Sequence, residues 1–272
     1  MKKKLLFLDL DGTLLNDEKQ ITAGNRKALE LALSRGHGVI ITTGRPLKSA
    51  MEQARKLGLD GPGCFLIAYN GAAVYDWAQQ KQIFSRALSL ETVYKVFDLV
   101  KAEGEHIQSY DTWDVLVEPR CDDAALHRYC HLSGMGYRVI GDVRKDLAEP
   151  PVKCLVINYL EKTGLLRIQD RIRKELDGEA DCFFSCDQYL EVVPKGMNKG
   201  QAVIRMCQMM GVEIADAVAV GDEANDLSMI PAAGVGVAMA NGTDQVKAAA
   251  DYITVCDNNH DGVAEVVEQF LQ

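Results

Sequence analysis

The sequence lacks a basic surplus and has no long apolar run. Its 272 residues contain 30 lysines and arginines against 39 aspartates and glutamates, which gives a net charge of -9. This balance argues against binding to nucleic acid or to an anionic membrane, because both need a basic face on the protein. No apolar run approaches the roughly 20 residues of a membrane span. We therefore expect neither nucleic acid nor membrane as a partner.

The sequence also lacks CxxC pairs among its eight cysteines, and several cysteines lie inside apolar runs, as Cys64 and Cys154 do. Reduced, partly buried thiols of this kind are typical of cytosolic proteins. The apolar stretch near the N-terminus is interrupted by Asp9 and is too short for a signal peptide. We expect a cytoplasmic protein, either a monomer or a weak homodimer.

Short apolar runs near residues 5–8, 39–42 and 64–68 alternate with segments of helical periodicity. Each run ends in a polar turn, and an uninterrupted apolar run is typical of a strand buried on both faces. Strands that alternate with helices in this way indicate an α/β fold with a doubly wound parallel sheet.

The pattern changes near residue 89, where mixed helices and neighbouring strands begin, as in an α+β domain. After residue 194 the first pattern resumes. We expect a discontinuous core of residues 1–83 and 192–272, with an inserted cap domain of residues 84–191. Residues 72–76 and 82–87 are expected to form short strands that leave the core sheet, and residues 225–230 a short helix.

The apolar run at residues 5–8 ends in two carboxylates, Asp9 and Asp11, followed by Gly12. Side chains two apart on an extended chain point the same way. Two neighbouring acids repel each other and need a cation, a shared proton or full solvation. Ligands of open α/β sheets bind beyond the carboxyl ends of the strands, where these acids are expected. A solvated turn remains the alternative for this segment taken by itself.

Further polar groups follow other expected strands, namely Thr43, Asn70 and Asp222. Asp222 belongs to the acidic segment GDEANDLSMI, which also supplies Glu223, Asn225 and Asp226. Carboxylate oxygens of Asp9, Asp11 and Asp222 would suit Mg²⁺, which prefers oxygen ligands. Lys199, at the start of a helix, adds a positive charge.

This set of groups is suited to phosphoryl transfer, in which the protein mainly positions groups and neutralises charge. A carboxylate can attack phosphorus, while a second carboxyl group protonates the leaving oxygen and later deprotonates water. A metal-bound carboxylate stays ionised, which favours Asp9 as the nucleophile. Asp11 then suits acid/base work, provided that the two environments separate the pKa values.

Four segments, DLDGT, TTGR, NKG and GDEAND, occur in this order. The sequence thereby resembles the haloacid dehalogenase superfamily of phosphatases. The TGR and NKG forms and the inserted cap are similar to its Cof-type subgroup. The resemblance implies a Rossmann-like core and Mg²⁺-dependent hydrolysis of small phosphomonoesters, sugar phosphates among them, through an aspartyl phosphate.

The resemblance also implies residue roles. Asp9 would be nucleophile and metal ligand, and Asp11 the acid/base, with its backbone carbonyl on the metal. Asp222 would be the third metal ligand, and Glu223 would contact a metal-bound water. The implied phosphate-binding residues are Leu10 through its backbone, Thr43, Gly44, Lys199 and Asn225. Three further residues are candidates for substrate contact or support, namely Arg45, Asn70 and Asp226, the last as a brace for Lys199.

Other functions compete with a phosphatase. A phosphosugar mutase or phosphotransferase of the same superfamily would pass the phosphoryl group back to a sugar. A signalling receiver is less consistent with the acids on the first strand and with the inserted domain. A non-catalytic phosphosugar-binding regulator would not need the Asp9 and Asp11 pair. We expect the inserted domain to be a mobile cap that selects the substrate.

Overall fold

The structure is a computed structural model that describes residues 2–272, and the chain forms two compact units. The first contains the chain up to Gly44 together with Ala50–Phe84 and Asn198–Gln272. The second contains Arg45–Ser49 and Ser85–Met197. The division of the chain into a catalytic core and a cap stays a prediction.

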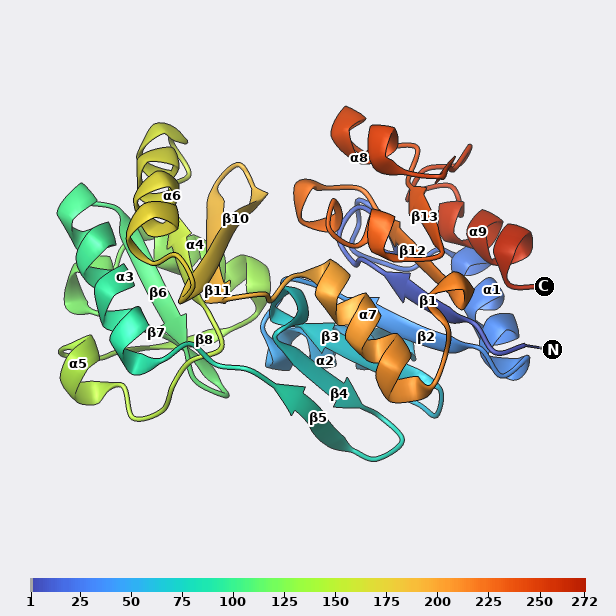
Figure 1. The fold of residues 1–272 in the computed structure, drawn as a ribbon, viewed down its shortest axis with the longest axis horizontal. Helices are drawn as coiled ribbons and strands as arrows, with labels where there is room; N and C mark the ends of the chain where they lie inside the picture. The colour runs from blue at the N-terminus through green and yellow to red at the C-terminus, as the bar shows by residue number, and fades with distance from the viewer. Residues whose placement is uncertain (1) are drawn as a thin grey trace. The chain divides into compact units, whose positions relative to one another are not determined.

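The first unit is built on an eight-stranded sheet with β1 between β12 and β2 (Figure 1). In sheet order the strands are β14 (Tyr252–Ile253), β13 (Val235–Ala238), β12 (Ala217–Gly221), β1 (Leu5–Leu8), β2 (Gly38–Thr42), β3 (Cys64–Ala68), β4 (Ala73–Asp76) and β5 (Lys81–Ser85). From β14 to β3 every neighbouring pair is parallel. The predicted α/β class with a parallel core sheet is confirmed.

One prediction about this sheet is wrong. Strands β4 and β5 do not leave it but extend it, and β4 pairs antiparallel with β3. The turn between them is Tyr69–Gly71, a 3₁₀ segment (η1) in which Tyr69 and Asn70 both have positive φ. This tight reversal returns the chain beside β3, which places the apolar residue Val74 opposite Ile67.

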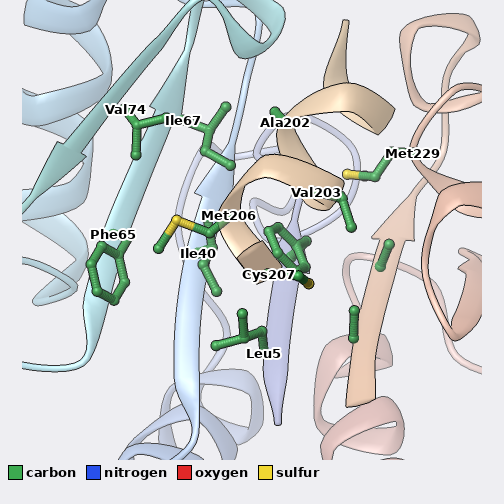
Figure 2. Packing of buried hydrophobic residues seen from close by; sticks show 13 residues of the cluster. Leu5, Ile40, Phe65, Ile67, Val74, Ala202, Val203, Met206, Cys207 and Met229 are labelled. Carbon is green, nitrogen blue, oxygen red and sulfur yellow. The ribbon is translucent and has the colours of Figure 1, made fainter. Parts of the chain in front are cut away.

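Helices cover both faces of the core sheet. They are α1 (Ala23–Ser34), α2 (Leu47–Leu57), α7 (Lys199–Met210), α8 (Asp244–Ala249) and α9 (Gly262–Phe270). Figure 2 shows α7 against the sheet, with Val203 and Met206 packed among Leu5, Ile40 and Phe65. Helix α1 packs against α9, and its N-cap is Thr22, whose hydroxyl accepts from the Asn25 amide.

The short helix predicted for residues 225–230 is instead two 3₁₀ segments, η4 (Ala224–Asp226) and η5 (Ile230–Ala232). Glu223 and Asp226 form a capping box at the start of η4, so side chains of this segment satisfy its first amides. Pro231 then lacks the amide that a continuous helix would need. A further 3₁₀ segment, η3 (Ile214–Asp216), precedes β12.

The second unit has a six-stranded sheet. In sheet order its strands are β10 (Ala180–Cys186), β11 (Tyr189–Pro194), β9 (Cys154–Ile157), β6 (His106–Tyr110), β7 (Asp114–Val117) and β8 (Gly136–Val139). Strands β10 and β11 pair antiparallel as a hairpin. The helical segments are α3 (Leu90–Glu103), η2 (Pro119–Cys121), α4 (Ala124–Ser133), α5 (Val143–Asp146) and α6 (Thr163–Glu175), with α3 packed on α6. The sequence missed α5, which has only four residues and therefore little periodicity.

None of the eight cysteines, all of which lie within the described residues, forms a disulfide, and all but Cys186 and Cys256 are buried. Within residues 2–272, none of the helices combines the length and the apolar content needed to cross a membrane.

Candidate active site

The site is built around the carboxyl end of β1, a strand whose four residues are all buried. Asp9 follows it directly and has only 6% of its surface exposed. The prediction that Asp9 and Asp11 lie on one extended segment is wrong, because the strand ends at Leu8 and the chain turns from Leu10 onward. Gly12 makes this turn with φ of 82°. A Cβ atom at Gly12 would lie 2.2 Å from Asp222 Oδ2, so glycine is required there.

Lys199 connects two carboxylates of the site. It opens α7, where Asn198 caps the helix by accepting from the Gln201 amide. The Lys199 ammonium donates to Asp9 Oδ1 and, at 2.6 Å, to Asp226 Oδ1. Burial alone would lower the pKa of Lys199, but the Asp226 and Asp9 carboxylates raise it above its ordinary value. The side chain therefore remains a buried cation.

Asp226 is held by contacts to both of its oxygens. Oδ1 accepts from Lys199, while Oδ2 accepts from the amides of Asp222 at 3.0 Å and Glu223 at 3.1 Å. These bonds fix Lys199 relative to the segment that follows β12. The structure thus places Asp226 against Lys199, as the role of a brace requires.

Asp222 completes the group of carboxylates. Its Oδ1 accepts from the Thr13 hydroxyl at 2.7 Å. Asp9, Asp222 and Asp226 each offer an oxygen, and these three oxygens lie within 4.8 Å of one another. Burial raises the pKa of Asp9 to about 7 against the opposing pull of Lys199. Burial, together with the Asp9 and Asp226 carboxylates, raises the pKa of Asp222 to about 8.

The donor set fits a hard divalent cation. Three buried carboxylates share one ammonium group, so ionisation of all three leaves an excess of negative charge. Carboxylate oxygens in this arrangement are the ligands that Mg²⁺ prefers. Because both oxygens of Asp226 are engaged, Asp9 and Asp222 are the side chains that would hold the ion.

Two residues of the predicted metal set lie outside this group of three carboxylates. Asp11 has 40% of its side chain exposed, and its Oδ1 accepts from Lys19 Nζ at 2.9 Å. The Glu223 side chain accepts from the Ala224 amide at 3.3 Å, as part of the local cap. Metal contacts of the Asp11 carbonyl and of Glu223 stay predictions.

Three of the phosphate-binding residues expected from sequence, Thr43, Gly44 and Asn225, lie next to Asn70. The Asn70 amide donates to the Thr43 carbonyl at 3.0 Å, which links the ends of β3 and β2. A Cβ at Gly44 would lie 2.9 Å from Asn70 Nδ2, so this turn passes tightly over the asparagine. Asn225 Nδ2 donates to Asn70 Oδ1 at 3.2 Å. Asn70 is fully buried and left-handed, with φ of 53°, a conformation that asparagine adopts more readily than most residues.

The remaining candidates are less closely defined. Leu10 is buried, and its expected backbone contact with phosphate stays a prediction. Arg45 belongs to the second unit, so its substrate contact is likewise untested. Sequence reasoning did not include Thr13 or Lys19 among the site residues. Thr13 belongs to the DLDGT segment, so the motif could have identified it. Lys19 follows eight residues after Asp11 and belongs to no motif.

Comparison with known proteins agrees with this geometry. Residues 6–267 match the sequence model of the haloacid dehalogenase-like hydrolase family. The chain is 30% identical over 269 residues to the 5-amino-6-(5-phospho-D-ribitylamino)uracil phosphatase YcsE of Bacillus subtilis, covering 98% of this chain and 96% of that protein. It is also 30% identical over 283 residues to YitU, a 5-amino-6-(5-phospho-D-ribitylamino)uracil phosphatase of the same organism, covering 99% of this chain and 98% of that protein.

A solved structure shares the fold over nearly its full length. It is a haloacid dehalogenase-like hydrolase from Bacteroides thetaiotaomicron, with a TM-score of 0.87 and 33% identity, covering 98% of this chain and 99% of that one. Family match, phosphatase relatives and shared fold agree with the DLDGT, TTGR, NKG and GDEAND segments. The chain therefore belongs to the haloacid dehalogenase superfamily, in its Cof-type subgroup, and is a phosphoric monoester hydrolase.

Proposed function

We propose that this phosphatase depends on Mg²⁺ and hydrolyses small phosphomonoesters, sugar phosphates in particular, through an aspartyl phosphate on Asp9. The observation that carries the proposal is the buried cluster in which Lys199 joins Asp9 to Asp226, next to Asp222. A lysine and several acids at the end of a parallel strand suit phosphoryl transfer, which needs positioning and neutralisation of charge.

Asp9 is the proposed nucleophile. The Lys199 ammonium holds Oδ1, which leaves the other carboxylate oxygen to attack phosphorus. The bond from that oxygen to phosphorus forms as the bond from phosphorus to the ester oxygen breaks. The leaving alcohol takes its proton from the carboxyl group of Asp11.

Asp11 then acts as the base. It removes a proton from water, the hydroxide attacks the aspartyl phosphate, and Asp9 is released together with inorganic phosphate. The part exposure of Asp11 supports this role, because the group must reach both a leaving alcohol and a water. In the proposal, Lys199 neutralises charge on the phosphoryl oxygens, while Thr43, Gly44 and Asn225 position them. Bound Mg²⁺ would keep Asp9 and Asp222 ionised and neutralise further charge on the phosphoryl group.

The proposed substrate class is supported by the names of two relatives. YcsE and YitU are both named for the phosphate ester of a ribityl chain, which is a polyol. Apart from Arg45–Ser49, the second unit lies between β5 and α7 in the sequence, and it includes none of the residues proposed here for the chemistry. We propose that this unit is a cap and selects the leaving group. A cytoplasmic location and a monomeric or weakly dimeric state remain our expectations.

The experiment is phosphate release from a panel of sugar and nucleotide monophosphates, with Mg²⁺ and with EDTA. We expect turnover of sugar phosphates with Mg²⁺ only. Turnover in EDTA would refute the metal dependence, and a preference for nucleotides would refute the substrate class. A sugar bisphosphate in the panel tests the mutase alternative, because isomerised sugar phosphate without free phosphate would favour that reaction.

The first turnover of p-nitrophenyl phosphate distinguishes the roles of Asp9 and Asp11, because its leaving group needs no proton. We expect Asp11→Asn to release a burst of nitrophenolate and then to stall as the phosphoenzyme. Asp9→Asn should give no burst, and circular dichroism should show that both variants are folded. A burst from Asp9→Asn would remove Asp9 from the role of nucleophile.

A further inference from the structure

The turn after β13 contacts two parts of the site at once. Its backbone is fixed by a hydrogen bond from the Met239 amide to the Gly221 carbonyl at 3.0 Å. The Gly242 amide donates to the Met239 carbonyl at 2.8 Å, and the Thr243 amide donates to the Asp222 carbonyl at 3.0 Å. The turn is therefore tied directly to the residue that follows β12.

Asn241, at the tip of this turn, reaches the loop that follows β1. Its Nδ2 donates to the Gly12 carbonyl at 2.7 Å, across 229 residues of sequence. Its Oδ1 accepts from the Asn258 amide at 3.1 Å. The side chain thus has a defined orientation, with its donor on the loop and its acceptor on a second segment.

Asn258 holds the same loop farther along. It is 3% exposed, and its Nδ2 donates to the Leu15 carbonyl at 3.0 Å and to Asp17 Oδ1 at 3.2 Å. Asn241 and Asn258 are together called the asparagine clamp here. They donate hydrogen bonds to the loop at the carbonyls of Gly12 and Leu15. Between these two points Thr13 holds Asp222, so the clamp fixes the backbone that carries this contact.

We propose that the asparagine clamp positions the loop of Asp11 to Leu15 for catalysis, with Asn241 as the residue that sets the Gly12 peptide. The inference rests on the proposed function, because it assigns the loop a part in the chemistry. Gly12 has φ of 82°, and glycine allows many backbone orientations, so a contact from outside the loop is needed to select one. Neither asparagine touches the reacting groups in this assignment, and both act through the loop.

A purely structural role predicts a different outcome from a positioning role. Asn241 is exposed, so loss of its hydrogen bonds should change stability little. The same loss would let the Gly12 peptide rotate, and small misplacements of catalytic groups lower rates strongly. Activity and stability should therefore respond separately to substitution of Asn241.

The test compares Asn241→Ala with Asn241→Asp and Asn241→Gln. Alanine removes both contacts, whereas aspartate keeps the acceptor for the Asn258 amide and loses the donor to Gly12. We expect kcat to fall about tenfold in both, with KM within about twofold, since the loss concerns positioning rather than substrate binding. Glutamine retains a donor and should recover part of the rate. Asn259→Ala is the matched control, because the Asn259 side chain bonds to Asp17, which lies beyond this loop.

Hydrogen exchange supplies a readout that does not depend on activity. Peptides covering residues 10–16 should exchange several-fold faster in Asn241→Ala than in the wild type, while the melting temperature stays within about 2 °C. Unchanged kcat together with unchanged exchange would overturn the clamp. An equal fall of kcat in Asn259→Ala would also overturn it, because the effect would then belong to loop anchoring in general. If the wild type hydrolysed no phosphomonoester, the proposed function would fail, while faster exchange would still support the clamp.

Discussion

Lys199 and Asp226 form an ion pair in which both side chains are fully buried. The distance from Nζ to Oδ1 is 2.6 Å, and neither side chain has any exposed surface. Removing one partner of a buried pair costs far more than removing a surface partner, because no water replaces the lost contact. Without Asp226, the Lys199 ammonium would keep only its contact with Asp9. The stability of the site therefore depends on this contact.

Asp226→Ala should lower the free energy of unfolding by about 3–5 kcal/mol, measured by urea denaturation. The substitution also removes the carboxylate oxygen that accepts hydrogen bonds from the backbone amides of Asp222 and Glu223. The matched control is Asp187→Ala in the second unit, whose pair with Lys162 has the same length of 2.6 Å but is exposed. That change should cost less than about 1 kcal/mol. Equal losses in the two variants would contradict the importance of burial.

Gly12→Ala should destabilise the protein and abolish phosphatase activity. The new methyl group would lie 2.2 Å from Asp222 Oδ2, in a backbone conformation with φ of 82° that alanine disfavours. Gly36→Ala is the control, since Gly36 has φ of 84° but nothing within 4 Å of a Cβ. We expect about 1–2 kcal/mol from backbone strain alone in the control, with normal kcat. Urea denaturation and phosphate release of both variants measure the difference, and similar activity in both would refute the clash.

Metal removal should affect stability in a pH-dependent way. The pKa values of Asp9 and Asp222 are raised to about 7 and about 8 in the fold, so the folded state prefers their protonated forms. Their favourable contribution is complete below the ordinary pKa of a free carboxyl group and is lost as pH rises through these values. In EDTA the melting temperature should therefore fall between about pH 4 and pH 8 and level off above that range, and added Mg²⁺ should raise it more at the upper end.

Asp222→Asn provides the comparison for this prediction. It removes one of the two raised carboxyl groups and should flatten the decline in EDTA. A decline that is as steep in Asp222→Asn as in the wild type would assign the effect to other groups.

Glu265 on α9 should stabilise the C-terminal segment mainly above mildly acidic pH. Burial opposes its ionisation, but the Tyr252 hydroxyl at 2.6 Å and the amides of Val255 and Cys256 at 3.0 Å outweigh burial and hold the pKa of Glu265 below its ordinary value. A lowered acid pKa adds stability above the ordinary value, and this stability is lost as pH falls through the folded pKa.

Glu265→Gln should therefore cost about 1 kcal/mol at neutral pH, and the difference from the wild type should shrink toward about pH 3. Urea denaturation across this range measures it. Glu268→Gln, an exposed change on the same helix, should have little effect at any pH. A loss in Glu265→Gln that stayed constant with pH would contradict the contribution of the charge.

Local patterns in the sequence determined the strands and the residues that follow them. The run Leu5–Leu8 is apolar throughout, so it becomes a central strand buried on both faces, and Asp9 follows it. The helix starts at Thr22 and Asn198 are likewise local, because each cap accepts from an amide three positions away. The DLDGT, NKG and GDEAND segments identify Asp9, Lys199 and Asp222 as site residues without any knowledge of the contacts between them.

Only the tertiary structure decided which groups meet. Lys199 and Asp9 are 190 residues apart, and Asn241 and Gly12 are 229 apart, so no local pattern relates them. The order of the parallel strands brings these segments together, and buried polar groups then select partners of matching chemistry. The sequence by itself determined the strand that presents Asp9 and the residue types around it. Folding decided that Lys199 joins Asp9 to Asp226 and that Asn241 holds Gly12, because such contacts exist only once distant segments are packed side by side.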